Sequence, residues 1–196
     1  MKKLSLLFII IGLLIIGYSV FQIVQGNMKQ KVALSEAKNI TQLDENKSTS
    51  DKLKPTFDDF NPLKGDTVGI LEIDKIEAEL PIVEGTDEDE LAKGVGHLKD
   101  TVYPTQNDQI LLSGHRDTVF MRMGELEIGD TMTVKMPYGD FTYEIYETFI
   151  VDADDTTVIR STAPDEVLTV TTCYPFSYLG NAPDRYIINA KPVPVY

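Results

Sequence analysis

The hydrophobic and polar positions divide the chain into three parts. Residues 4–24 form an uncharged and mostly apolar stretch, residues 25–59 are mostly polar, and residues 60–196 alternate short apolar runs with turn-forming residues. An apolar stretch of about 20 residues makes a helix about 30 Å long, which matches the hydrocarbon core of a bilayer. The first part therefore predicts a transmembrane helix.

The competing interpretation of this stretch is a cleaved secretion signal. Such a signal has a shorter apolar region followed by a small-x-small cleavage site, and residues 20–25 (VFQIVQ) offer none. We therefore predict an uncleaved anchor, with residues 1–3 as its cytoplasmic tip. The lysines in residues 1–3 favour this orientation, although Lys29 and Lys31 beyond the span weaken the charge bias.

The second part, residues 25–59, is predicted to be a polar stalk or linker. Ala33, Ala37 and Ile40 have a helical spacing, so the start of the linker can continue the membrane helix. As flexible coil, the linker would span about 30 Å on average.

The third part, residues 60–196, is predicted to be one all-β domain with short helices. The runs are rich in β-branched and aromatic residues and are separated by Gly, Pro, Asn and Asp. The predicted strands cover residues 67–73, 77–83, 108–113, 131–136, 141–151, 167–172 and 185–191, with a short helix at 88–93. Many short strands at close spacing favour a barrel or a sandwich.

Composition excludes several functions. The net charge of −13 argues against nucleic acid, whose phosphates need basic patches. The chain contains no glycine loop of the phosphate-binding type and no cysteine-histidine cluster of the zinc-binding type.

Candidate chemistry centres on Cys173, the single cysteine of the chain. It ends a β-like run, and the proline that follows Tyr174 stops the strand. Buried cysteines usually fill space inside an element, whereas loop-bearing strand ends are where catalytic groups collect. From this setting alone, Cys173 could be a packing residue or a nucleophile.

Two other runs place polar residues at strand ends. His115 follows the apolar run at 109–114, and Arg185 opens the run at 185–190. If the runs before and after the loop at 174–184 are antiparallel neighbours, Cys173 and Arg185 lie at the same sheet edge. A guanidinium near a thiol stabilises the thiolate and can donate two hydrogen bonds to a substrate oxygen.

These residues resemble the motifs of a known family. The run TVTTC at 169–173 resembles the Thr-Leu-x-Thr-Cys signature of the sortases, with Val170 in place of leucine. The run LSGH at 112–115 resembles their histidine segment, and RYII at 185–188 resembles their arginine strand. The resemblance implies a cysteine transpeptidase of Gram-positive bacteria on an eight-stranded β-barrel, with its catalytic domain outside the cytoplasm.

The resemblance also implies roles and partners. Cys173 would be the nucleophile, His115 the general acid and then base, and Arg185 the residue that positions substrate and stabilises the oxyanion. The substrates would be surface proteins that carry a Leu-Pro-x-Thr-Ala or Leu-Pro-x-Thr-Gly type sorting signal. The acceptor would be a peptidoglycan or cell-wall amine, without a cofactor. A single N-terminal anchor and a compact barrel resemble class D best and class A next.

Other residues have a structural and a functional interpretation. We expect His97 to be structural or groove-lining, and Thr171 and Thr172 to be strand residues that could contact substrate. Arg116 could compete with Arg185, but an ion pair with its neighbour Asp117 is the simpler expectation.

Two loop regions have less specific interpretations. The acidic clusters at 86–90 and 152–155 could bind calcium, but a solvated acidic surface is the simpler explanation. We expect residues 154–164 to form a mobile loop beside the site.

Two alternative functions stay open at this stage. A sortase-like thiol hydrolase would use water instead of an amine as acceptor. A catalytically silent binding module could keep the barrel, because a fold alone does not establish activity. A papain-like peptidase is disfavoured, because its cysteine would precede its histidine.

Overall fold

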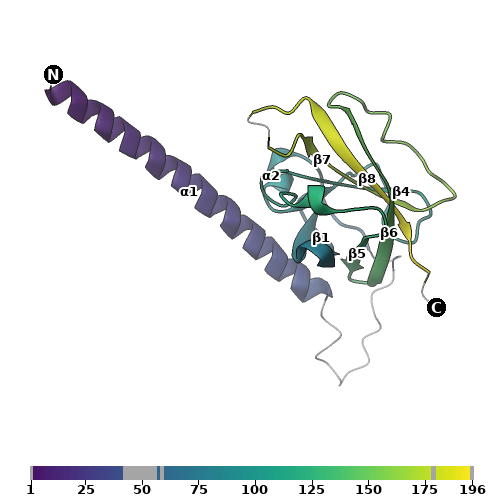
Figure 1. Ribbon diagram of the computed structural model, residues 1–196. Coiled ribbons are helices and arrows are strands. Elements are labelled where there is room, and N and C mark those ends of the chain that lie inside the picture. Colours follow the sequence, from purple (N-terminus) through teal and green to yellow (C-terminus); the bar gives the residue numbers. More distant parts are fainter. Residues whose placement is uncertain (1, 42–56, 58–59, 178–179, 195–196) are drawn as a thin grey trace.

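The computed structural model describes residues 2–41, 57, 60–177 and 180–194. Its first element is one long helix, α1 (Lys2–Thr41) (Figure 1). The large apolar side chains of this helix from Leu7 to Val24 are exposed. With a mean hydropathy of 2.6 in its most apolar window, this helix is long and apolar enough to cross a bilayer. The rest of the predicted linker, at 42–56 and 58–59, lies outside the described residues.

Eight strands close into a barrel in the order β1-β2-β3-β4-β7-β8-β6-β5. The predicted eight-stranded barrel preceded by an apolar helix is therefore confirmed. The strands are β1 (Thr67–Ile73), β2 (Ala78–Glu84), β3 (Val95–His97), β4 (Gln109–Gly114), β5 (Thr131–Met136), β6 (Gly139–Asp152), β7 (Val167–Tyr174) and β8 (Asp184–Pro192). Short helices complete the fold: η2 (Asp74–Ile76), α2 (Glu88–Leu91) and η3 (Met123–Glu125).

Each predicted strand lies within two residues of an observed one at both ends, but β3 was not predicted. In and next to this strand, two glycines lie very close to the backbone of neighbouring segments. A Cβ added at Gly96 would lie 2.4 Å from the carbonyl oxygen of Gly85, and one at Gly94 would lie 2.3 Å from that of Pro81. Glycine is required at these positions, so the alternating pattern that marks a strand is lost.

The strand pairings bring the ends of three strands together. β4 and β7 run parallel, with Gly114 opposite Thr172. β7 and β8 run antiparallel, with Cys173 opposite Arg185. The residues that follow β4, end β7 and begin β8 therefore meet at one edge of the barrel.

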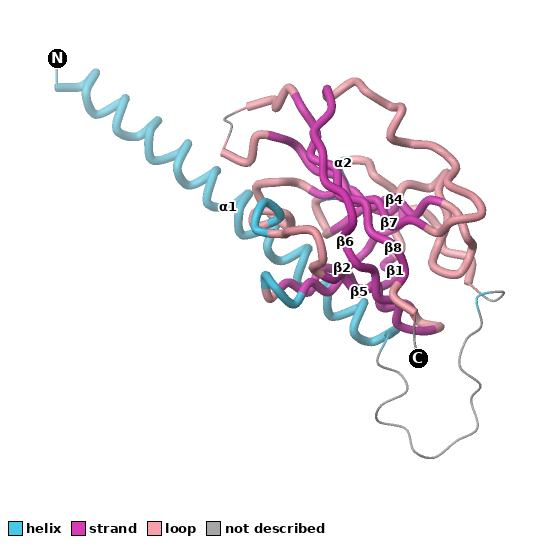
Figure 2. Tube along the Cα trace, turned by 45° about the vertical axis from the view of Figure 1, so that its right-hand side comes forward, coloured by secondary structure: helices cyan, strands magenta, loops and turns pink. Residues whose placement is uncertain are grey.

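The C-terminal part of α1 packs against β1 and β2. Ala33 and Ala37, one turn apart, are 3% and 0% exposed. Glu36 accepts a hydrogen bond of 2.8 Å from the hydroxyl of Thr67, and Lys38 pairs with Glu79. Figures 1 and 2 both show this part of the helix beside the barrel, while its N-terminal part projects away.

Candidate active site

Cys173 lies on the outer face of the barrel. Leu168, Val170 and Thr172 on β7 are 0%, 0% and 3% exposed and face the interior. Because successive strand residues point to opposite faces, Thr171 and Cys173 face outward. Both are partly exposed, so the thiol is held on a rigid strand within reach of a ligand.

Arg185 lies directly opposite Cys173 in the β7–β8 ladder. Its Nη1 donates to the carbonyl oxygens of Asp184 at 3.0 Å and Ala182 at 3.4 Å. These bonds hold the guanidinium beside the turn that enters β8.

His115 reaches the same edge through β4. The hydroxyl of Thr172 donates to the carbonyl oxygen of Gly114 at 2.7 Å and fixes the end of β4 against β7. Gly114 has no room for a side chain, because an added Cβ would lie 2.5 Å from ring carbons of Phe120. The tight packing of Gly114 against Phe120 therefore fixes the backbone position of His115, the next residue.

The three side chains Cys173, His115 and Arg185 line one groove of about 440 Å³. Thr171 and Thr172 also line it. Its further lining consists of Thr86, Leu91, Leu98, Leu111, Ser113 and Gly114 from the β2–β4 region and of Ala153, Asp155, Thr156, Val158 and Ile159 from the β6–β7 loop. A thiol, an imidazole and a guanidinium on one groove are the groups that acyl transfer through a thioester requires.

Arg116 supports the loop that follows Cys173. Its guanidinium donates to the carbonyl oxygen of Pro175 at 3.0 Å and to that of Gly180 at 2.8 Å. Sequence reasoning placed it in an ion pair with Asp117 and missed this contact, since the partners lie about 60 residues away along the chain.

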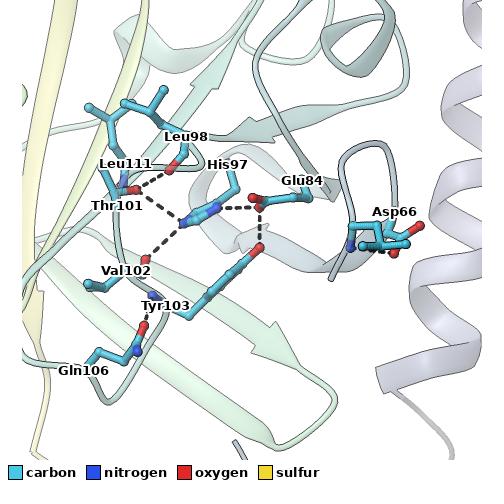
Figure 3. A network of polar contacts seen from close by, with 10 residues as sticks. Asp66, Glu84, His97, Leu98, Thr101, Val102, Tyr103, Gln106 and Leu111 are labelled. Carbon is cyan, nitrogen blue, oxygen red and sulfur yellow. Dashed lines mark hydrogen bonds and ion pairs between the residues drawn. The ribbon is translucent and has the colours of Figure 1, made fainter. Parts of the chain in front are cut away.

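His97 does not line the groove. Its side chain is 1% exposed, and its Nδ1 lies 2.7 Å from Oε2 of Glu84 (Figure 3). The same carboxylate oxygen accepts a hydrogen bond from the hydroxyl of Tyr103, whose ring stacks on the imidazole at 4.0 Å. Nε2 lies 3.0 Å from the carbonyl oxygen of Val102 and 3.3 Å from the hydroxyl of Thr101.

The network of Glu84, His97 and Tyr103 supports one wall of the groove. Leu98, next to His97, and Thr86, two residues after Glu84, both line the groove. Burial opposes the charged form of Glu84, but hydrogen bonds from His97 and Tyr103 outweigh it and lower the pKa of this carboxyl. Burial and the bond to Glu84 raise the pKa of Tyr103.

Among the described residues, no group of three or more His, Cys, Asp or Glu side chains could hold a metal ion. In the first acidic cluster, Lys64 pairs with Asp87 and also lies 3.8 Å from Glu90. In the second, the carboxylate of Asp155 accepts bonds from the amide and hydroxyl of Thr157.

Comparison with known proteins identifies the family. A model of the sortase domain matches residues 71–193. Sortase D of Bacillus subtilis (strain 168) is 54% identical over 198 residues, which cover 98% of this chain and 100% of that protein.

Solved structures give the same result. A Clostridium perfringens sortase D5 transpeptidase has a TM-score of 0.68 at 27% identity, over 85% of this chain and 99% of that chain. Sortase C1 from Streptococcus agalactiae has a TM-score of 0.61 at 28% identity, over 66% of this chain and 69% of that chain. The family and the enzyme class predicted from the sequence motifs are thus confirmed. The chain belongs to the sortase family of cysteine transpeptidases.

Proposed function

We propose that this chain cleaves a sorting signal of the Leu-Pro-x-Thr-Ala or Leu-Pro-x-Thr-Gly type after the threonine and joins the protein to a peptidoglycan amine. The observation that supports this most strongly is that Cys173, His115 and Arg185 line one groove. The chain has one cysteine, so no other side chain can supply a thiolate.

The reaction divides into two acyl transfers. The sulfur of Cys173 attacks the carbonyl carbon of the threonine, the peptide C–N bond breaks, and His115 gives a proton to the departing amine. The product is a thioester between Cys173 and the threonine. An incoming amine then attacks that thioester and loses a proton to His115, an amide forms, and the C–S bond breaks to restore the sulfur.

Arg185 is assigned to the oxygen that becomes negative in both steps. Its position opposite Cys173 allows the guanidinium to donate to an oxyanion formed at the sulfur-bound carbon. Thr171, partly exposed on the groove, is assigned to substrate contact. Thr172 and His97 are assigned to support, because their side chains are 3% and 1% exposed and bonded within the protein.

We place the N-terminus in the cytoplasm, residues 4–24 in the bilayer and the domain at 60–196 on the outer surface. The apolar helix supports a single membrane span, and the lysines of residues 1–3 support the orientation. Surface proteins with sorting signals and the cell-wall amine would then reach the groove from outside.

The test uses the full-length protein in detergent micelles with a Leu-Pro-x-Thr-Ala or Leu-Pro-x-Thr-Gly peptide, with and without a peptidoglycan-like amine. Product mass spectrometry should show the peptide cleaved after threonine and a new amide to the added amine. Free acid in the same yield regardless of amine would instead identify a hydrolase. No cleavage of either peptide would contradict the proposed sorting signal.

A further inference from the structure

The loop between β6 and β7, residues 153–166, forms part of the groove that holds Cys173. Its residues Val158 and Ile159 line that groove together with His115 and Arg185. From the sequence we expected residues 154–164 to be a mobile loop. In the structure, this loop is attached to the barrel by side chains at the start of β4.

Gln109, the first residue of β4, binds the loop backbone on both sides of Ile159. Its Nε2 donates to the carbonyl oxygen of Val158 at 2.8 Å, and its Oε1 accepts from the amide of Arg160 at 3.0 Å. Nε2 also donates to the hydroxyl oxygen of Thr169 at 3.0 Å. The side chain is 5% exposed, and both N–H groups and the oxygen of its amide form hydrogen bonds.

The orientation of this amide is fixed by a chain of hydrogen bonds across the sheet. The carboxylate of Glu147 only accepts, so Asn189 turns its Nδ2 toward it, at 3.0 Å. Oδ1 of Asn189 therefore faces Thr169, whose hydroxyl donates to it at 2.9 Å. Thr169 can then only accept from Gln109, which directs the amide nitrogen of Gln109 toward the carbonyl of Val158.

Asp108 holds the following part of the same loop. Its carboxylate accepts from the amide of Thr162 at 2.6 Å, the amide of Ala163 at 3.2 Å and the hydroxyl of Ser161 at 3.0 Å. Chiefly because of the bond from Thr162, the pKa of Asp108 lies below its ordinary value. Two neighbouring residues thus bind the loop from 158 to 163.

We propose that Gln109, assisted by Asp108, is a positioning residue that holds the β6–β7 loop as a preformed wall for the bound sorting signal, an inference that rests on the proposed function. β4 carries Gln109 at its start and is followed by His115, so one rigid strand sets both the loop and the histidine. A wall ordered before substrate arrives lowers the entropy cost of binding. Gln109 consequently acts on KM more than on kcat.

The main variant is Gln109→Glu in the full-length protein in detergent micelles. It has nearly the same shape, but it replaces the amide nitrogen by an acceptor facing the carbonyl of Val158. Gln106→Glu is the matched control, because exposed Gln106 uses only its Oε1, to accept from the amide of Tyr103 at 2.8 Å, and a carboxylate keeps that bond. Asp108→Ala, at a partly exposed position, is a second variant that leaves the core intact.

Two measurements are made on each protein: hydrogen exchange of residues 153–166, and KM and kcat for the sorting-signal peptide. Loss of such hydrogen bonds should speed exchange in the loop about tenfold and raise KM about tenfold. We expect kcat to stay within about threefold, as expected when binding rather than transition-state stabilisation is lost. Gln106→Glu should match the wild type in both measurements.

Unchanged exchange in both Gln109→Glu and Asp108→Ala would overturn the inference. Faster exchange with unchanged KM would overturn it as well, because the loop position would then be irrelevant to binding. Both results presuppose an active wild type. A wild type that cleaves no sorting-signal peptide would instead contradict the proposed function, and the role assigned to Gln109 would fall with it.

Discussion

At the scale of single residues, the site depends on positions where packing or strand register sets which group reaches the groove. Gly114 is one of them, because it precedes His115 and its Cα faces the ring of Phe120. Arg185 is another, because its register opposite Cys173 places a guanidinium at the groove.

Gly114→Ala should lower kcat about a hundredfold, the cost of a displacement of about 1 Å in a catalytic group. The added Cβ would lie 2.5 Å from Phe120, so either the ring or the end of β4 must move, and His115 moves with it. Overpacking should also lower the free energy of unfolding by about 1–3 kcal/mol. Steady-state kinetics and urea unfolding test both effects, and a wild-type kcat would show that the position of His115 tolerates the shift.

Arg185→Lys should reduce kcat by about 10²- to 10³-fold, the usual effect of removing one oxyanion donor. Lysine keeps the charge but loses the planar fork of the guanidinium. Arg116→Lys is the comparison, because Arg116 donates to the carbonyl groups of Pro175 and Gly180, and it should have a smaller effect. Wild-type kinetics for Arg185→Lys together with inactivity of Arg116→Lys would assign the oxyanion role to Arg116.

Glu84 should make the protein sensitive to acid. Its folded pKa is lowered from an ordinary value of 4.5, so its stabilising contribution is complete above pH 4.5 and is lost as the pH falls through the folded pKa. The measurement is urea unfolding of wild type and Glu84→Gln between pH 7 and pH 3. The difference in unfolding free energy between wild type and Glu84→Gln should become smaller as the pH falls. A difference independent of pH would contradict a stabilising role of the charged Glu84 carboxylate.

At the scale of elements, the positions of most strands could be predicted from the sequence, but only some of the pairings between strands could. The β-branched runs identified every strand except β3, where Gly96, and Gly94 directly before the strand, allow close approach of the backbone. Cys173 and Arg185 could be placed together from an antiparallel pairing of consecutive runs. His115 joins them only through the parallel pairing of β4 with β7, which periodicity does not specify.

The loop contacts could not be predicted at all. Gln109 binds Val158 and Arg160, and Asp108 binds Thr162, across about 50 residues of chain. Polar residues at a strand start usually face solvent, so no local pattern distinguishes these two. Hydrogen bonds between segments far apart in the chain can be identified only once the fold is known.

The docking of α1 on the barrel gives a prediction at the same scale. Ala37 is 0% exposed, so Ala37→Glu would place an unpaired carboxylate between helix and barrel and release the helix. Hydrogen exchange of residues 28–41 should then become faster. Ser35→Glu puts the same charge on an exposed position of the same helix and should leave exchange unchanged. Protected amides in Ala37→Glu would show that the helix does not depend on this contact.

At the scale of the whole molecule, one helix joins the apolar segment to the catalytic barrel. From Val24 at the end of the predicted span to the first docked alanine, Ala33, the helix rises about 13 Å. The barrel thus packs against the same helix that carries the apolar segment. With residues 4–24 in the bilayer, as proposed above, the length of the helix would set the distance of the barrel from the membrane. Under the same proposal, the groove would face substrates near the membrane surface.

The role of Cys173 as nucleophile is tested by the intact mass of the full-length protein after incubation with a Leu-Pro-x-Thr-Ala or Leu-Pro-x-Thr-Gly peptide. We expect an added mass equal to the peptide up to its threonine, located on Cys173, absent in Cys173→Ala and removed by an added amine. A folded Cys173→Ala protein that still acquires the same mass, or a wild type that cleaves the peptide without an adduct on Cys173 even when quenched early, would contradict it.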